Sequence, residues 1–352
     1  MNSLFQKLMI NATRLTAKGD LKAATAAIQA ALAGNSPVSQ ASPPATPADV
    51  LDVVAREVGA PATPEPRAAK GRTVRGSHGD ALARRDYKLY VPPEAGEAPQ
   101  PLVVMLHGCT QDADDFAAGT AMNELARTQG FYVLYPEQST QANPQRCWNW
   151  FKHTHQERGR GEPALIAAMA REVMAKHAID PSRVYVAGLS AGGAMAAILG
   201  DTYPDLFAAV GVHSGLAAGA ARDLPSAFGA MKGSAQIVLP ATPSGVPTIV
   251  FHGDADTTVH PGNGGHVITA SVRRGAGAET AKGVAAGGRS YTRSLHRLPG
   301  EGPVVAEHWV VHGAPHAWSG GSAKGTYTDP AGPDASAEMI RFFLAQRLQP
   351  TL

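Results

Sequence analysis

The stretch YVAGLSAGGAMAAIL, residues 185–199, decides the fold, because it places one serine between glycines at the end of a short apolar run. Gly188, Ser190 and Gly192 form the pattern G-x-S-x-G, with an expected strand before it and a helix of small residues after it. A turn this sharp leaves no room for side chains beside the serine, so glycine is needed on both flanks. The stretch predicts a turn that lifts the Ser190 hydroxyl above the edge of the sheet, where it could act as a nucleophile. The alternative is a glycine-rich turn between strand and helix that has no catalytic role.

Short apolar segments alternate with amphipathic ones on both sides of this turn. We expect strands at 84–92, 101–108, 131–136, 182–188, 206–215, 246–254 and 306–313, and helices at 114–130, 162–178 and 334–348. Apolar strands that alternate with helices predict an α/β fold with a mostly parallel, doubly wound sheet. In such a sheet, functional residues gather in the loops that follow the carboxyl ends of the strands.

The amino-terminal part has a different composition. Residues 1–34 contain two short amphipathic segments separated by Gly19 and Asp20, which predicts a helical hairpin. Residues 35–68 are rich in proline and alanine, which is typical of an extended linker. We therefore expect three parts: the hairpin, the linker and an α/β domain over 69–352.

The composition excludes several classes of partner. The 31 basic and 29 acidic residues nearly balance, which argues against nucleic-acid binding, and no apolar run is long enough for a membrane span. The first residues lack the unbroken apolar core of a signal peptide, which favours a cytoplasmic location. No metal or nucleotide motif is present, so we expect no cofactor. Cys109 and Cys147 could form one disulfide or remain reduced.

A serine nucleophile needs a base and an orienting acid, in the chain order serine, acid, histidine for this fold. His316 follows the last expected strand and is flanked by glycines, whereas His312 lies nearer that strand and is more typical of a structural residue. Asp254 and Asp256 both follow the strand at 246–254, and composition does not separate them. Three loops thus supply Ser190, an aspartate and His316 in the required order.

A fourth loop is expected to bind the oxyanion that forms during acyl transfer. The strand at 101–108 ends in His107-Gly108-Cys109, which is the usual place for one backbone donor. The Ala191 N–H and the N–H of Gly108 or Cys109 would then face the developing negative charge.

Several motifs together resemble the esterase family of poly(3-hydroxybutyrate) depolymerases, which also includes feruloyl and acetylxylan esterases. The motifs are LHGCTQDADDFA, CWNWF, GLSAGGAMA, HGDADTTVHPGNG and HAWSGG, and the resemblance covers about residues 85–345. It implies an α/β-hydrolase fold and serine esterase activity through an acyl-enzyme. The implied substrate is a polyhydroxyalkanoate polymer or oligomer, with feruloyl or acetylated polysaccharide as the alternative.

The resemblance also assigns roles to individual residues. It implies Asp256 as the triad acid, the Cys109 N–H as the second oxyanion donor, and a disulfide between Cys109 and Cys147. This disulfide and the secreted members of the family favour an extracellular or periplasmic location as the alternative to the cytoplasm. Four side chains beside these motifs are candidates for substrate binding: His107, Trp148, Trp150 and Trp318. The alternative for the three tryptophans is that they belong to the core.

The predicted hairpin at 1–34 supports a function of another class. Its apolar face could bind a polyester granule or a lipid surface, or it could mediate self-association. An intact set of serine, aspartate and histidine argues for the enzyme as the first choice.

Overall fold

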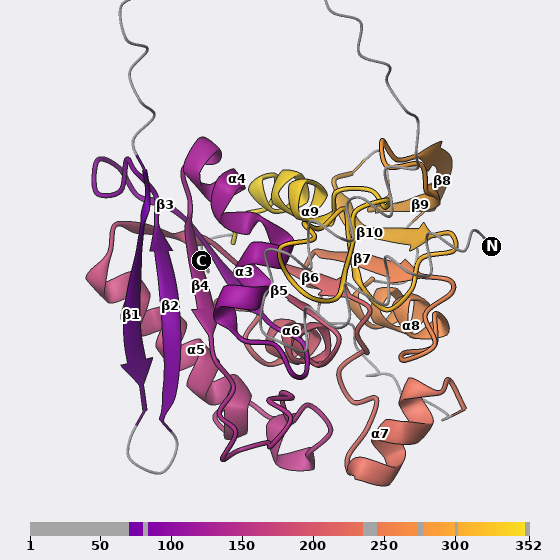
Figure 1. Ribbon diagram of the computed structural model, residues 1–352, viewed down its shortest axis with the longest axis horizontal. Helices are drawn as coiled ribbons and strands as arrows, with labels where there is room; N and C mark the ends of the chain where they lie inside the picture. Colours follow the sequence, from indigo (N-terminus) through magenta and orange to yellow (C-terminus); the bar gives the residue numbers. More distant parts are fainter. Residues whose placement is uncertain (1–69, 80–83, 235–244, 273–276, 300–301, 349–352) are drawn as a thin grey trace, which may run out of the picture. The chain divides into compact units, whose positions relative to one another are not determined.

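The computed structural model of the chain describes residues 70–79, 84–234, 245–272, 277–299 and 302–348. The predicted hairpin at 1–34 and the linker at 35–68 lie outside these residues. The expected α/β domain lies almost wholly within them, and this unit is described below (Figure 1).

A ten-stranded sheet forms the centre of the domain, in the order β1-β2-β4-β3-β5-β6-β7-β10-β9-β8. The six strands from β4 to β10 in that order run parallel, and antiparallel pairs flank them at both ends. The strands are β1 (Arg72–His78), β2 (Arg85–Val91), β3 (Gln100–Leu106), β4 (Tyr132–Pro136), β5 (Ile179–Leu189), β6 (Ala209–His213), β7 (Thr248–Gly253), β8 (Gly277–Val284), β9 (Ser290–Arg297) and β10 (Val304–Val311). All seven expected strands are present, so the predicted α/β class is confirmed.

The outer strands β1, β8 and β9 were not expected from the sequence. Their residues are exposed or half-buried throughout, and β8 has the polar sequence GAETAKGV. Strands at the edges of a sheet are covered less than central ones, so they need no continuous apolar run. A short parallel pair, β11 (Trp318–Ser319) and β12 (Thr328–Asp329), lies outside the main sheet.

Helices cover both faces of the sheet, and the sheet separates the core into two apolar clusters. One apolar cluster contains side chains of α5 (Gly161–Lys176), α6 (Ala191–Thr202), α7 (Leu224–Met231) and α8 (Gly262–Ser271). The other contains side chains of α3 (Ala113–Thr120), α4 (Met122–Gln129) and α9 (Ala335–Leu344), and α4 and α9 lie side by side in Figure 1. Along β3, alternate residues enter opposite clusters, as the pleat of a strand requires. The central strands are therefore buried on both faces, which explains their continuous apolar runs.

The single helix expected over 114–130 is two helices in the structure. α3 ends and α4 begins at Ala121, whose backbone has φ 52° and ψ 22°. The nearest glycine, Gly119, lies two residues before the break and keeps a helical conformation, whereas the left-handed residue is an alanine, which rarely adopts that conformation. The expectation of one continuous helix was therefore wrong, and the helical pattern alone could not show it.

Candidate active site

Ser190 stands at the turn between β5 and α6, at the carboxyl end of a central parallel strand. Its backbone has φ 57° and ψ −117°, a strained conformation for a residue other than glycine, and its N–H donates to the His213 carbonyl at 2.8 Å. A Cβ on Gly188 would lie 2.4 Å from the Gly192 backbone, and one on Gly192 would lie 2.0 Å from the Leu106 carbonyl oxygen. The glycines are therefore required by close backbone contacts, as the sequence predicted.

Asp256 and His316 meet beyond the carboxyl ends of β7 and β10. The His316 Nδ1 lies 2.7 Å from the Asp256 Oδ2, while Oδ1 accepts the N–H groups of Thr258 and Val259 at 2.8 and 2.9 Å. Burial would raise the pKa of Asp256, but hydrogen bonds from His252 and His316 outweigh it and hold the pKa well below its usual range. A carboxylate that stays ionised can hold the imidazole in the tautomer with the proton on Nδ1.

Asp254, the alternative that composition left open, contacts a different histidine. Its Oδ2 lies 2.8 Å from His312 Nδ1, and its Oδ1 accepts the Gly313 N–H at 2.6 Å. The His312 Nε2 lies 2.8 Å from the Thr292 hydroxyl on β9. Both ring nitrogens of His312 are thus engaged, and this pair fastens the β9 strand to the loops beyond β7 and β10.

His213, at the end of β6, connects the Ser190 turn to the loop that carries His316. Its carbonyl accepts the Ser190 N–H, and its Nε2 accepts the Ser319 N–H at 2.9 Å. The ring stacks on Trp318 with centroids 5.1 Å apart. Ser190 and His316 both lie within the described residues, and no hydrogen bond joins their side chains. Such bonds are often long before substrate binds.

The backbone beside Ser190 offers two N–H groups for an oxyanion. The Gly108 N–H donates to Gln111 Oε1 at 2.9 Å, so it is already engaged. Within the described parts of the chain, the N–H groups of Cys109 and Ala191 donate to no acceptor. The loop of Cys109 and the start of α6 lie close together: a Cβ on Gly192 would lie only 2.6 Å from the His107 carbonyl oxygen. This pattern favours Cys109 over Gly108 as the second donor.

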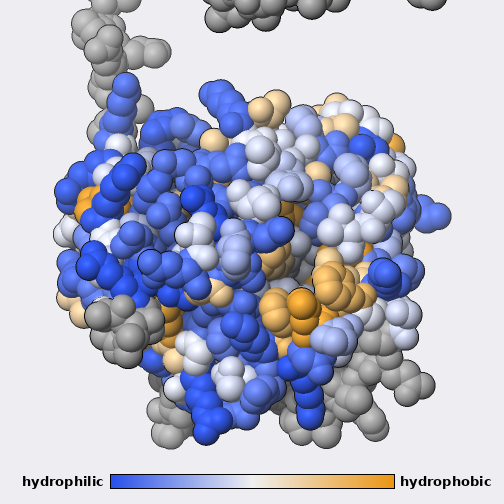
Figure 2. All heavy atoms as spheres, turned by 60° about the horizontal axis from the view of Figure 1, so that its bottom comes forward, coloured by the Kyte–Doolittle hydropathy of each residue, from blue (hydrophilic) through white to orange (hydrophobic). Residues whose placement is uncertain are grey.

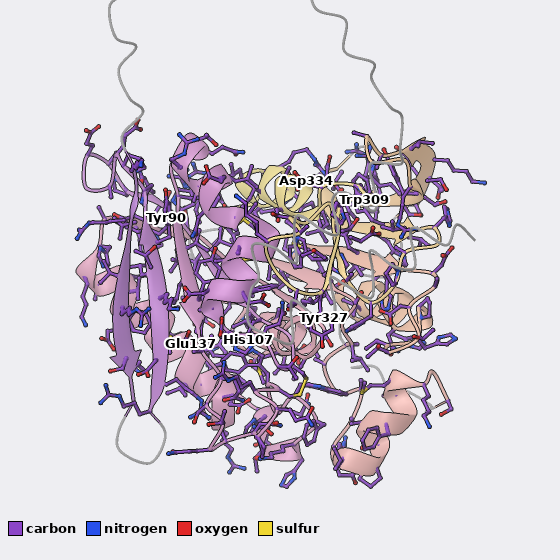
Figure 3. The ribbon with its side chains drawn as sticks, viewed as in Figure 1. Tyr90, His107, Glu137, Trp309, Tyr327 and Asp334 are labelled. Carbon is purple, nitrogen blue, oxygen red and sulfur yellow. A yellow bond between two sulfur atoms is a disulfide. The ribbon has the colours of Figure 1, made fainter. Side chains whose placement is uncertain are left out.

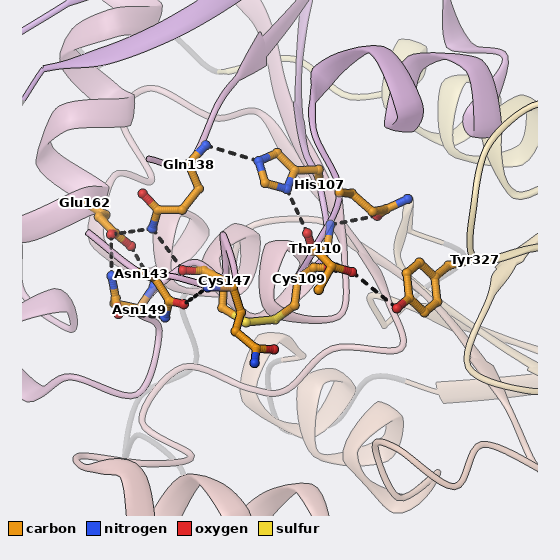
Figure 4. Close-up of a disulfide and its surroundings, with 12 residues drawn as sticks. His107, Cys109, Thr110, Gln138, Asn143, Cys147, Asn149, Glu162 and Tyr327 are labelled. Atoms are coloured by element: carbon orange, nitrogen blue, oxygen red, sulfur yellow. Dashed lines mark hydrogen bonds between the residues drawn. A yellow bond between two sulfur atoms is a disulfide. The ribbon is translucent and has the colours of Figure 1, made fainter. Parts of the chain in front are cut away.

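A disulfide joins Cys109 to Cys147, with Cα atoms 4.2 Å apart (Figure 4). The pairing that the family resemblance implied is therefore present. The loop that carries Cys147 is held from behind by the buried Glu162, whose Oε1 accepts from Gln138 and Asn149 at 2.6 and 2.7 Å. The loop that carries Cys109 is thereby covalently attached to a loop that is itself held by hydrogen bonds.

The structure places the four candidate substrate-binding side chains in the core. His107 is buried, with its Nδ1 bonded to the Gly108 carbonyl and its Nε2 to the Gln138 N–H, and burial lowers its pKa to about 4 (Figure 4). Trp148, Trp150 and Trp318 are at most 4% exposed. In this conformation they shape the loops around the site rather than forming an open wall.

Tyr327 is an aromatic residue near the site that the sequence analysis missed. It is 47% exposed, and its hydroxyl lies 3.2 Å from the Thr110 hydroxyl, next to Cys109 (Figures 3 and 4). Its loop follows His316, and proximity to HAWSGG in the sequence was the one signal that could have indicated it.

Other large exposed apolar side chains, Leu224 and Phe228, lie on α7. On the face turned forward in Figure 2, hydrophobic residues gather beside a hollow.

Two further observations concern metals and membranes. Among the described residues, no group of three or more histidine, cysteine, aspartate or glutamate side chains could hold a metal ion. Within the same residues, none of the helices has the length and apolar character needed to cross a membrane.

Known proteins with similar sequences include several esterases. Poly(3-hydroxyalkanoate) depolymerase C of Paucimonas lemoignei is 39% identical over 187 residues, which are 49% of this chain and 44% of that protein. Feruloyl esterase B of Thermothelomyces thermophilus is 36% identical over 150 residues, 42% of this chain and 50% of that one. A probable acetylxylan esterase A of Aspergillus clavatus is 33% identical over 195 residues, 50% of this chain and 61% of that one. The chain therefore spans about half the length of these relatives.

Among solved structures, an acetyl xylan esterase from Aspergillus awamori superposes with a TM-score of 0.62 at 21% identity, covering 78% of this chain and 99% of that one. The sheet order and this likeness define an α/β-hydrolase fold. The model of the family Esterase PHB depolymerase matches residues 85–293, more than half of the chain. The chain belongs to this family.

Proposed function

We propose that the protein is a serine carboxylic-ester hydrolase that acts through an acyl-enzyme. The observation that carries the proposal is the Asp256–His316 pair, in which the carboxylate is buried and the imidazole is partly exposed, at the same sheet edge as the strained Ser190 turn. A hydroxyl on such a turn and an imidazole oriented by an ionised carboxylate are the parts that acyl transfer needs.

In this proposal, the Ser190 Oγ attacks the ester carbonyl while the His316 Nε2 accepts the hydroxyl proton. Asp256 holds the Nδ1 proton and stabilises the imidazolium. The negative oxygen of the tetrahedral intermediate accepts hydrogen bonds from the Cys109 and Ala191 N–H groups, each worth about 3 kcal/mol in the transition state. His316 then protonates the departing alcohol. Water, deprotonated by the same nitrogen, releases the acid and restores Ser190.

For the substrate, we propose esters of 3-hydroxyalkanoate polymers or oligomers. The support is the family and the relative with the highest identity among those described above, a poly(3-hydroxyalkanoate) depolymerase. Acylated polysaccharide is the second candidate, because feruloyl and acetylxylan esterases match at 36% and 33% identity.

The substrate proposal is tested by the product released from each natural substrate. The protein is incubated with 3-hydroxybutyrate oligomers, acetylated xylan and feruloylated arabinoxylan, and the Ser190→Ala variant is the blank. We expect 3-hydroxybutyrate to be released fastest, and none of the three acids from the variant. Faster release of acetate or ferulate would replace the polyester by the polysaccharide. Equal release by wild type and variant would contradict the serine mechanism.

The predicted hairpin at 1–34 supports a separate proposal, either adsorption to a polyester surface or self-association. Deletion of residues 1–66 tests both, by sedimentation with polymer granules and by the mass of the protein in solution. Polymer binding and oligomeric state that both survive the deletion would exclude the hairpin from either role.

A further inference from the structure

A second histidine contacts the carboxylate of Asp256. His252 is the last residue but one of β7, four residues before Asp256, and its side chain is 1% exposed. Its Nε2 lies 3.4 Å from Asp256 Oδ2, the oxygen that also faces His316 Nδ1. The mechanism described above gives His252 no role, yet two imidazoles converge on one carboxylate oxygen.

The surroundings of His252 determine which of its nitrogens carries the proton. The Nε2 lies 2.9 Å from the carbonyl oxygen of Val259, and the nearby Asp256 oxygen is likewise an acceptor. Because neither oxygen can donate, the proton must be on Nε2, shared between the two acceptors. The ring therefore directs an N–H dipole at the carboxylate and, at the same time, at the loop that returns from it.

The other side of the ring lies near a half-buried histidine, His308. The Nδ1 of His252 and the Nε2 of His308 on β10 have no hydrogen-bond partner among the described residues. They lie 3.3 and 2.8 Å from the point that a Cβ on Gly264 of α8 would occupy. An Nδ1 without a protein acceptor agrees with a neutral ring whose proton is on Nε2. Two further titratable groups among the described residues interact with this cluster, His213 on β6 with His252 and His296 on β9 with His308. Burial holds the pKa values of His213, His296 and His308 below their usual range.

We propose that His252 is a positioning residue of the active site, which holds Asp256 toward His316 and offsets part of the carboxylate charge through its Nε2–H. This inference rests on the proposed esterase function. Without the N–H, Asp256 would be held less firmly in the orientation that aligns His316, and its carboxylate would keep more of its negative charge for the proton on His316. The imidazolium of His316 would then persist to higher pH, and less of the base would be free at neutral pH.

The test compares the pH dependence of kcat/KM for a soluble aryl ester in wild type, His252→Leu and His252→Gln. Leucine removes the donor, whereas the glutamine amide can place an N–H near the position of Nε2. For His252→Leu we expect kcat/KM to fall about tenfold to a hundredfold, mainly through kcat. Its acidic limb should move upward by roughly 0.5 to 1 pH unit. For His252→Gln we expect most of the rate and the original limb to return.

His312→Leu is the matched control, since it removes a histidine from the neighbouring aspartate–histidine pair. It should leave the acidic limb where it is in wild type. An unchanged limb in a folded His252→Leu protein, or a limb in His252→Gln that shifts as far as in His252→Leu, would overturn the proposal. Absence of Ser190-dependent hydrolysis in wild type would instead refute the proposed function.

A measurement on the wild type does not depend on whether a variant folds. Nitrogen–proton correlation spectra of the imidazole rings report which nitrogen carries the proton. We expect His252 to carry its proton on Nε2 at pH 8. A proton on Nδ1, with Nε2 bare beside two acceptors, would contradict the inference.

Discussion

Two aspartate–histidine pairs lie in the same pair of loops, and they differ in what surrounds them rather than in their own geometry. Asp256–His316 and Asp254–His312 have Oδ2–Nδ1 distances of 2.7 and 2.8 Å. The side chains of the first pair are 0% and 12% exposed, and those of the second are 41% and 38% exposed. The second histidine also uses its Nε2 to bind Thr292, whereas no hydrogen bond involves the Nε2 of His316 among the described residues.

The comparison identifies the features by which we propose one pair as catalytic and the other as structural. A short contact between a carboxylate and an imidazole occurs in both. Only Asp256–His316 combines a buried carboxylate with an Nε2 that has no hydrogen-bond partner among the described residues. This pair also lies at the edge of the sheet where Ser190 stands. The largest difference between the two pairs is expected when each aspartate is replaced by asparagine.

Asp256→Asn should lower kcat/KM by about 10⁴-fold, because the amide no longer holds His316 in the required tautomer. Asp254→Asn should lower it by less than about threefold, as expected for an exposed position away from the reaction. Steady-state kinetics on an aryl ester measure both. If both variants lose activity to the same extent, the distinction between the pairs is wrong.

The disulfide joins the loop that carries Cys109, the proposed oxyanion donor, to the loop of Cys147. Cys147→Ala should lower the free energy of unfolding by about 2–4 kcal/mol, since the bridge closes a long loop. It should lower kcat/KM about tenfold or more, because the Cys109 N–H loses its fixed direction. Urea unfolding and kinetics without reductant measure the two effects. Reductant should impair the wild type and leave the variant unchanged; a wild type insensitive to full reduction would contradict this role.

The two aspartates should also differ in how stability depends on pH. Hydrogen bonds hold the pKa of Asp256 well below its value in the unfolded chain, which is about 3.9. Its contribution to stability is therefore present above that value and is lost as the pH falls toward the folded-state pKa. The gap in unfolding free energy between wild type and Asp256→Asn should narrow from pH 5 to pH 3. The gap for the exposed Asp254→Asn should stay small throughout, and a constant gap for Asp256 would argue against this coupling.

The smallest expected effect concerns Thr292, whose hydroxyl contacts His312 of the exposed Asp254–His312 pair. Thr292→Val removes the hydroxyl that binds the His312 Nε2 and should cost about 1 kcal/mol of stability or less. The kcat/KM should stay at the wild-type value. Thermal unfolding and aryl-ester hydrolysis report the two quantities. A large loss of activity would mean that this hydrogen bond supports catalysis after all.

The sequence alone predicted the parallel centre of the sheet, because those strands are buried on both faces and have continuous apolar runs. It missed the edge strands, whose polar residues look like loops, and the break at Ala121, which depends on tertiary packing. The motifs predicted Ser190 and His316 in two loops, and the structure places both loops at the carboxyl edge of the parallel strands. Composition could not choose between Asp254 and Asp256, since burial separates them and burial is a property of the fold. For the same reason, aromatic residues near a motif could not be assigned to a binding wall or to the core.

The most direct test of the account is the rate at which a fluorophosphonate labels the protein, mapped by peptide mass in wild type, His316→Ala and His312→Ala. The account predicts one label on Ser190 in the wild type, the same rate in His312→Ala, and little or no label in His316→Ala. Labelling of Ser190 that is equally fast in His316→Ala, or no labelling of the folded wild type, would contradict it.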